Sequence, residues 1–168
     1  MVEDELSTLA QVTVDRVTGL SNRSGFLEIA GHLLPLCQRK EQPAALWMFQ
    51  IQNLLDIESR ISKEEAGATA VEFADILKNG FRESDVVARL SFDVFAVLLA
   101  GSSLNDTQQA RKLLDEVMGE RNSQQSTERF LELVSFAAAY EPSRHENASD
   151  LLRDAEAGLV EVSTTQVA

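Results

Sequence analysis

The feature that most limits the fold is a pair of short β-prone runs with almost no residues between them. "DVVARL" covers residues 85–90 and "DVFAVLLA" covers residues 93–100. Two such runs with so short a connection predict an antiparallel hairpin whose tip lies at Ser91 and Phe92. The centre of the chain is therefore predicted to form part of a β-sheet.

Two further runs predict additional strands. "PAALWMFQI", residues 43–51, is too short for a full helix and carries its Pro at the first position, where a strand tolerates it. It predicts a buried strand, with Trp47 in the core. "FLELVSFAAAY", residues 130–140, predicts another strand.

Stretches with helical spacing surround these runs, because their apolar residues recur at intervals of three and four. The helical segments are residues 4–12, 22–40, 62–79, 104–118 and 148–162. Pro35 predicts a kink or a division of the second segment. The polar stretch 119–129 predicts a surface loop. Helices that alternate with about four strands predict a mixed sheet covered by helices.

Side-chain chemistry predicts details of three helices. Ser21 or Asn22 is placed to cap the segment that begins near residue 22, and Asn147 or Ser149 to cap the last segment. In the fourth segment, the side chains predicted to face inward are Ala110, Leu113, Leu114 and Val117.

Length and charge limit the classes of function. A chain of 168 residues is the size of one ordinary domain. The formal net charge of −12, without a Lys or Arg cluster to offset it, opposes binding to polyanions, so no nucleic-acid partner is expected. The apolar runs are shorter than the ~20 residues of a bilayer-spanning helix, so no membrane insertion is expected.

Several residue types that often form sites are predicted to be structural. Cys37 is the single cysteine, which excludes an internal disulfide and a cysteine-based metal site, and it is expected to be a buried thiol. His32 and His145 have no partner at metal-ligand spacing, so both are predicted to be surface or helix-face imidazoles.

The stretch "DRVTGLSNR", residues 15–23, resembles the opening motif of the GGDEF family, the diguanylate cyclases that condense two GTP molecules into cyclic di-GMP. The matching residues are Asp15, Thr18, Gly19, Leu20, Asn22 and Arg23, and Val17 stands where the family has Leu. The resemblance covers residues 13–163. It implies an α+β, palm-like nucleotide-cyclase domain with a ferredoxin-like core and a five-stranded, mostly antiparallel sheet surrounded by helices.

This resemblance also suggests how the chain is divided. Residues 14–163 are expected to form a degenerate GGDEF domain. Residues 1–13 are expected to be a helical connector from an upstream part of the protein, and residues 164–168 a flexible tail.

The family signature Gly-Gly-Asp-Glu-Phe is degenerate in this chain. The five matching positions are Ser91, Phe92, Asp93, Val94 and Phe95. Ser91 and Phe92 place side chains where two glycines let phosphates approach the backbone. Val94 replaces the acidic residue that is implicated in activating the nucleophile, and a Val side chain can neither accept a proton nor bind a metal.

Other positions that bind GTP in the family also differ. Gln50 and Gln52 stand at acidic positions of the first strand, where Mg²⁺ would need carboxylates. Glu58 and Gly67 replace the Asn and Asp that recognise guanine, and Ser163 replaces a Lys that contacts phosphate. The resemblance therefore predicts a catalytically inactive domain with no catalytic residue, no metal and no cofactor.

"RESD", with Arg82 nine positions before Ser91, matches the inhibitory motif that binds cyclic di-GMP in the family. A guanidinium can donate to the O6 and N7 edge of guanine, and a carboxylate can accept from its N1–H and N2–H groups. The alternative for Arg82 and Asp85 is a solvated ion pair. Arg111 is a candidate for a second basic contact.

The favoured interpretation is a regulatory module of cyclic di-GMP signalling in the bacterial cytoplasm. Its expected partners are cyclic di-GMP itself, sensor or EAL-type signalling domains, and a second copy of the chain in a homodimer. Two alternatives stay open: a diguanylate cyclase with residual activity, and an interaction scaffold that binds no nucleotide.

Overall fold

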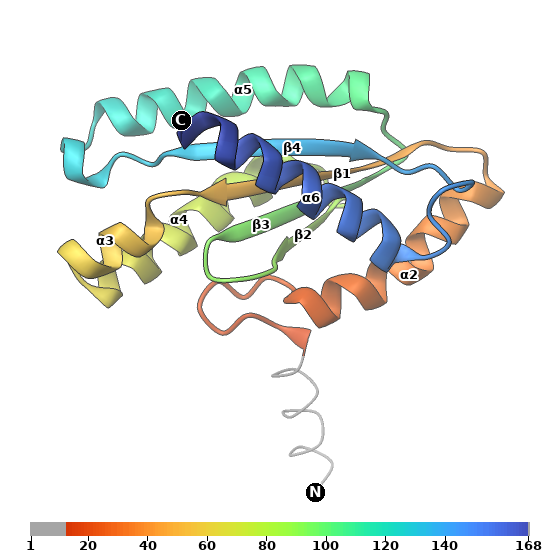
Figure 1. The fold of residues 1–168 in the computed structure, drawn as a ribbon, viewed down its shortest axis with the longest axis horizontal. Helices are drawn as coiled ribbons and strands as arrows, with labels where there is room; N and C mark the ends of the chain where they lie inside the picture. Colours follow the sequence, from red (N-terminus) through yellow and green to blue (C-terminus); the bar gives the residue numbers. More distant parts are fainter. Residues whose placement is uncertain (1–12, 168) are drawn as a thin grey trace, which may run out of the picture.

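The computed structural model describes residues 13–167, and the helix expected at residues 4–12 lies outside this range (Figure 1). The elements are α2 (Arg23–Arg39), β1 (Ala44–Ile51), α3 (Leu54–Arg60), α4 (Lys63–Gly80), β2 (Val86–Arg89), β3 (Val94–Ala100), α5 (Leu104–Ser123), a 3₁₀ turn (Thr127–Arg129), β4 (Leu133–Ala139) and α6 (Ala148–Val167). None of the helices in this range is long and apolar enough to cross a membrane.

One antiparallel sheet organises the domain, with strand order β2-β3-β1-β4. The predicted hairpin is confirmed, because β2 pairs with β3 around a tip at residues 90–93. The expectation of five strands is wrong for the described residues, which form four. The segment beside β2 contributes only isolated bridges, Val14 to Ser21 and Ser21 to Ala88, because the turn there folds back on itself.

Helices cover both faces of the sheet, as the sequence predicts (Figure 1). The odd-numbered side chains of β1, such as Trp47 and Phe49, pack with α3, α4 and α5. The even-numbered Leu46 and Met48 pack with α2 and α6. All residues of β1 except Gln50 are buried, so this strand is the centre of two hydrophobic layers.

Helix α2 begins where the sequence predicts, because the Oδ1 atom of Asn22 accepts a hydrogen bond from the Gly25 N–H at 2.9 Å. The predicted division at Pro35 is wrong, since α2 continues through it to Arg39. Leu34 and Cys37 on either side of the proline are buried against the sheet, and this packing holds the helix together across it.

Helix α5 is longer and more exposed than the pattern predicts. It continues to Ser123, into the stretch expected to be a loop, where the Arg121 side chain pairs with Glu72 of α4. Leu113 is 64% exposed and Val117 is also exposed, so their predicted inward orientation is wrong. Only a narrow face of α5 is buried against the sheet, and Leu114 belongs to that face.

Two helix boundaries also depart from the pattern. The seven-residue helix α3 was not predicted, because its two buried residues, Leu54 and Ile57, are too few to show a period. Helix α6 begins after Asn147, whose Oδ1 atom accepts from the Asp150 N–H at 3.0 Å. It continues to Val167, so residues 164–167, expected to be a tail, belong to a helix.

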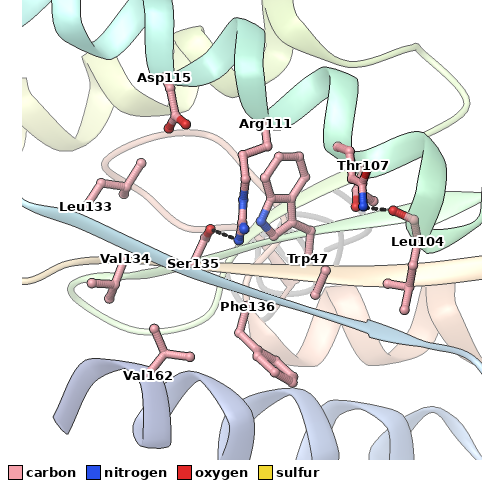
Figure 2. Close-up of a pocket in the computed structure, with 12 residues that line it drawn as sticks. Trp47, Leu104, Thr107, Arg111, Asp115, Leu133, Val134, Ser135, Phe136 and Val162 are labelled. Carbon is pink, nitrogen blue, oxygen red and sulfur yellow. Dashed lines mark hydrogen bonds between the residues drawn. The ribbon is translucent and has the colours of Figure 1, made fainter. Parts of the chain in front are cut away.

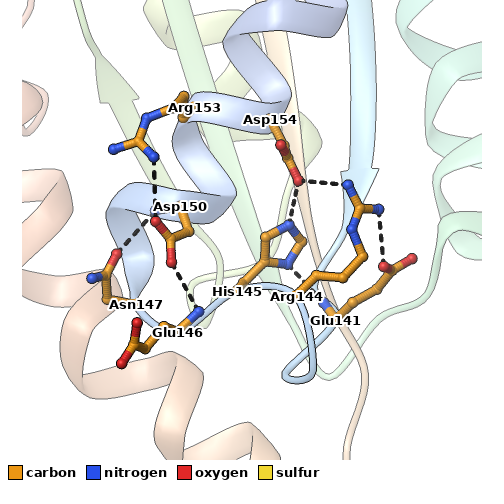
Figure 3. Close-up of polar contacts among 8 residues, drawn as sticks. All are labelled: Glu141, Arg144, His145, Glu146, Asn147, Asp150, Arg153 and Asp154. Carbon is orange, nitrogen blue, oxygen red and sulfur yellow. Dashed lines mark hydrogen bonds and ion pairs between the residues drawn. The ribbon is translucent and has the colours of Figure 1, made fainter.

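His145 lies in the loop before α6 and is buried, which makes the prediction of a surface imidazole wrong (Figure 3). Its Nδ1 atom accepts a hydrogen bond from the Glu141 N–H at 2.9 Å. The proton of the neutral ring is therefore on Nε2, which lies 2.6 Å from the Oδ2 atom of Asp154. This bond to His145 lowers the pKa of Asp154 despite the opposing effect of desolvation. The ring thus fastens the loop to α6.

Replacing His145 with Leu is expected to lower the free energy of unfolding by about 1–2 kcal/mol, because it removes the acceptor of the partly buried Glu141 N–H and the bond to Asp154. Chemical denaturation followed by circular dichroism measures this change. His32 is the matched control, since it is exposed on α2 and its replacement by Leu should change stability by no more than about 0.5 kcal/mol. Equal losses in both variants would contradict the role of the His145 contacts.

Candidate functional site

The opening turn is fastened to the hairpin tip by a buried arginine. The Nη1 atom of Arg89, at the end of β2, donates to the Oδ2 atom of Asp15 at 3.2 Å. Its Nε and Nη2 atoms donate to the Phe92 carbonyl at 3.2 and 2.6 Å. The guanidinium also lies within 6 Å of the ring centres of Phe92 and Phe95. Arg89 therefore fixes the position of the tip relative to the turn.

Asp15 is held in its charged form at this junction. Burial raises the pKa of its carboxyl group, but the hydrogen bonds from the Thr18 hydroxyl and N–H and the charge of Arg89 together lower it below 3.8. Thr18 and Gly19 of the opening motif complete the turn, with Gly19 at a φ of 75°, a conformation that favours glycine. The motif therefore has a structural role in this chain.

A pocket of about 430 Å³ lies beside the hairpin tip. It brings together the candidate positions Glu58, Gly67, Ser91 and Phe92, which are far apart in the sequence. Phe92 is partly exposed and contributes a ring to the wall. Its charged lining is balanced, because Asp15 and Glu58 lie in it with Lys63 and Arg89.

A hydrogen-bonded cluster of polar side chains lies outside the lining of that pocket. The Nε2 atom of Gln50 donates to the Oδ2 atom of Asp93 at 3.1 Å, and its Oε1 atom accepts from the Ser163 hydroxyl at 3.1 Å. The Nε2 atom of Gln52 donates to the Ser163 Oγ atom at 3.1 Å. We call Gln50, Gln52, Asp93 and Ser163 the amide cluster. It joins β1, the hairpin and α6.

The amide cluster does not fit a magnesium ion. It holds one carboxylate, Asp93, and one of its oxygens already accepts a hydrogen bond from an amide. Mg²⁺ prefers carboxylate oxygens and retains its water ligands, so two amides and a hydroxyl are a poor ligand set. Among the described residues, no group of three or more His, Cys, Asp or Glu side chains is arranged to hold a metal ion.

Arg82 and Asp85 form an ion pair in the structure. The Nη2 atom of Arg82 lies 3.2 Å from the Oδ1 atom of Asp85 and also donates to the Ser102 Oγ atom at 2.7 Å. The Asp85 side chain is 1% exposed, while that of Arg82 is 57% exposed. The arginine is therefore the accessible member of the pair, and the aspartate fixes its orientation.

The neighbouring pocket is small, about 150 Å³, and both residues line it with Ser102 and Asp106. Arg111, the candidate for a second basic contact, is not part of its lining. Arg111 instead donates from Nη2 to the Ser135 Oγ atom at 2.9 Å and lies over Trp47. The structure therefore brings Arg82 and Asp85 together and places Arg111 at a different pocket.

Arg89 is the residue of this region that the sequence did not single out. Its partner Asp15 is 74 positions away, so no local spacing connects the two. A cation at the end of a β-prone run, directly before a turn, is common on protein surfaces. Only the fold shows that this one is buried.

Comparison with known proteins agrees with the fold and the motifs. Residues 12–166 match the family described as diguanylate cyclase, GGDEF domain. The chain is 24% identical over 155 residues to diguanylate cyclase DgcS of Shewanella oneidensis. This alignment covers 92% of this chain and 51% of DgcS. It is 35% identical over 101 residues to diguanylate cyclase TpbB of Pseudomonas aeruginosa, covering 59% of this chain and 23% of TpbB. The chain thus spans about half or less of these relatives.

Solved structures show the same architecture. The isolated GGDEF domain of TpbB superposes with a TM-score of 0.80 at 27% identity, over 90% of this chain and 89% of that one. The GGDEF domain of DgcB from Caulobacter crescentus, solved in complex with cyclic di-GMP, superposes with a TM-score of 0.80 at 15% identity, over 91% of each chain. With the family match extending over nearly its whole length, the chain belongs to the GGDEF domain family of diguanylate cyclases.

Proposed function

We propose that this chain is a catalytically inactive GGDEF domain that acts as a regulatory module in cyclic di-GMP signalling. The amide cluster is the observation that carries the proposal. Where the family requires a carboxylate on the first strand, Gln50 bonds instead to the signature residue Asp93 and to Ser163. These side chains bond to one another, and a single carboxylate among them is a poor ligand set for Mg²⁺.

The chemical losses at this site are several and independent. Val94 cannot act as a base, Ser163 carries no charge to contact phosphate, and Glu58 and Gly67 stand where the family recognises guanine with Asn and Asp. A loss of about 4 kcal/mol of transition-state stabilisation already slows a reaction about a thousandfold. Several such losses together support an inactive domain better than a weakened enzyme.

Incubation of the purified chain with GTP and either Mg²⁺ or Mn²⁺ tests this proposal. The expected result is no cyclic di-GMP above background in chromatography and mass spectrometry. An active diguanylate cyclase under the same conditions is the positive control. Product that disappears in an Asp93→Asn variant would establish residual catalysis and contradict the proposal.

The regulatory role is proposed to depend on cyclic di-GMP at Arg82. The Arg82 side chain is accessible, and the buried Asp85 carboxylate holds it in place. The complex of the DgcB domain with cyclic di-GMP supports this ligand for the fold. The small adjoining pocket accommodates only part of a cyclic dinucleotide, so most of the ligand would lie on the surface.

Calorimetric titration with cyclic di-GMP tests the ligand. Replacing Arg82 with Ala is expected to weaken binding about 10–100-fold, since it removes charge-assisted hydrogen bonds. The matched control is Arg153→Ala, because Arg153 is also exposed and pairs with an aspartate three residues away. Absence of heat for the unmodified chain at millimolar ligand would favour the alternative of a scaffold that binds no nucleotide.

The proposal also covers the location of the domain in the cell and its partner domains. The domain is proposed to work in the cytoplasm, joined to or contacted by sensor or EAL-type domains, with homodimerisation as one route of regulation. The relatives DgcS and TpbB are longer than this chain, which supports a role within a larger protein. Residues 14–163 as the domain, with a connector before it, stay a prediction.

A further inference from the structure

Strand β4 forms an edge of the sheet, and the register shows which of its backbone groups face outward. The Tyr140 N–H donates to the Ala44 carbonyl, and the Gln52 N–H donates to the Glu132 carbonyl. Even-numbered residues therefore carry the hydrogen bonds between β4 and β1. In an antiparallel ladder the alternate residues turn their N–H and C=O groups the other way. The outward residues of β4 are Leu133, Ser135, Ala137 and Ala139.

The two edges of the sheet differ. On the outer side of β2, the Arg89 N–H donates to the Ser21 carbonyl at 2.9 Å, so the opening turn covers part of that edge. The residues of β4 are only half-buried, except for Val134. No described segment pairs with the outer side of β4 in the sheet. This edge is therefore available for another strand.

A groove of about 550 Å³ runs along this edge, between α5 and α6 (Figure 2). Five successive residues of β4, 133–137, line it, so its length follows the strand. Helix α5 contributes Arg111 and Asp115, and α6 contributes Val162. The groove thus combines a strand edge with polar side chains on one wall and an apolar contact on the other.

The groove also contains an unsatisfied donor. The Trp47 side chain is 1% exposed, and its Nε1 atom has no hydrogen-bond partner among the described residues. Arg111 lies over this ring with its guanidinium carbon 6.0 Å from the ring centre (Figure 2). A guanidinium has only donors, so it cannot accept the indole proton. The Nε1 atom is closed to solvent in this structure, so an entering acceptor would have to displace neighbouring side chains to bond to both groups.

We propose that this groove binds an extended peptide segment of a partner protein, which adds to the sheet beside β4 and presents a carboxylate to Trp47 and Arg111. Backbone groups that alternate along 133–139 match an extended chain, which offers donors and acceptors at the same spacing. The indole N–H and the guanidinium both match a carboxylate. A small anion could supply the carboxylate but not the row of backbone donors and acceptors.

The first test uses amide hydrogen exchange of the full chain, followed by NMR. The Ser135 and Ala137 amides are expected to exchange quickly in the isolated chain, while the Val134, Phe136 and Ala138 amides, bonded to β1, exchange slowly. Slow exchange of Ser135 and Ala137 would mean that the edge is already occupied, and it would overturn the proposal.

The second test selects binders for the full chain from a phage-displayed random peptide library. Enriched peptides are expected to contain Asp or Glu and to shift the indole N–H resonance of Trp47, which is unambiguous because the chain has a single Trp. The Ser135 and Ala137 amides should become protected in the complex. An Ala137→Pro variant is expected to weaken binding at least about tenfold, because the outward N–H is lost while the bonds to β1 remain.

A second variant covers the case in which Ala137→Pro does not fold. Trp47→Phe keeps a ring in the core but removes the indole N–H, so the peptide should again bind at least about fivefold more weakly. His32→Ala on α2 is the control and should bind as the unmodified chain does. Failure to enrich any peptide, or unchanged affinity in both variants, would each overturn the proposal.

Discussion

Replacing Arg89 with Met is expected to lower the free energy of unfolding by about 3–5 kcal/mol. The Arg89 side chain is 7% exposed and pairs with Asp15, whose side chain is 23% exposed, so its removal leaves a partly buried carboxylate without its charge partner. It also removes two hydrogen bonds to the Phe92 carbonyl at the hairpin tip. Urea denaturation of the two proteins at neutral pH measures the difference.

Arg60→Met is the matched control, because Arg60 pairs with Asp56 at a similar distance but both side chains are exposed. Exposed pairs contribute little, and this variant should lose no more than about 0.5 kcal/mol. A similar loss in the two variants would mean that burial of the Arg89 pair has no consequence for stability.

The Arg89 effect should also depend on pH. The pKa of Asp15 is lowered in the folded chain, so its contribution is present above its unfolded value and is lost as the pH falls through its folded value. The difference in unfolding free energy between the unmodified chain and Arg89→Met should therefore narrow as the pH falls below about 4. A difference that stays constant down to pH 2 would contradict this account.

Replacing Gly25 with Ala is expected to destabilise the chain by about 1–3 kcal/mol. A Cβ atom at Gly25 would lie 2.3 Å from the Thr13 carbonyl oxygen, which is a backbone atom and cannot rotate away. The same carbonyl accepts the Asn22 N–H at 2.9 Å and closes the opening turn. The substitution therefore forces the turn away from α2, and thermal or urea denaturation would detect the loss.

Gly31→Ala is the control on the same helix. A Cβ atom there would have no neighbour within 4 Å, so the substitution should stabilise the chain by about 0.5–1 kcal/mol through helix propensity. The two Gly→Ala variants are thus expected to differ by about 1.5–4 kcal/mol. If Gly25→Ala were as stable as Gly31→Ala, the close contact with Thr13 would have no energetic role.

The predicted elements that are confirmed depend on patterns that lie within one helix, strand or hairpin. The strand at 43–51, the hairpin around Ser91 and Phe92, and the cap at Asn22 all follow from adjacent residues. The predictions that are wrong concern features that tertiary packing determines. Pro35 stays inside α2, and Leu113 stays exposed, because neighbouring elements determine which surfaces are buried.

Some features of the candidate site could likewise be predicted from the sequence, and others could not. The opening motif and the degenerate signature could be identified from the sequence, and the family match confirms the membership in the GGDEF family, while the degeneracy of the signature stays a prediction. That Gln50 would bond to Asp93 and Ser163 could not be predicted, because these partners lie 43 and 113 positions away. The burial of Arg89 and of His145 was missed for the same reason, since neither has a local signal.

The sequence by itself determined the family, the order of most helices and strands, and the residues that replace the signature, because each depends on local spacing or on residue identity. Tertiary structure alone decided which polar side chains meet, which charges are buried, and which sheet edge stays open. The physical reason is that hydrogen bonds and ion pairs depend on distances in space, and for residues far apart in the chain folding sets those distances.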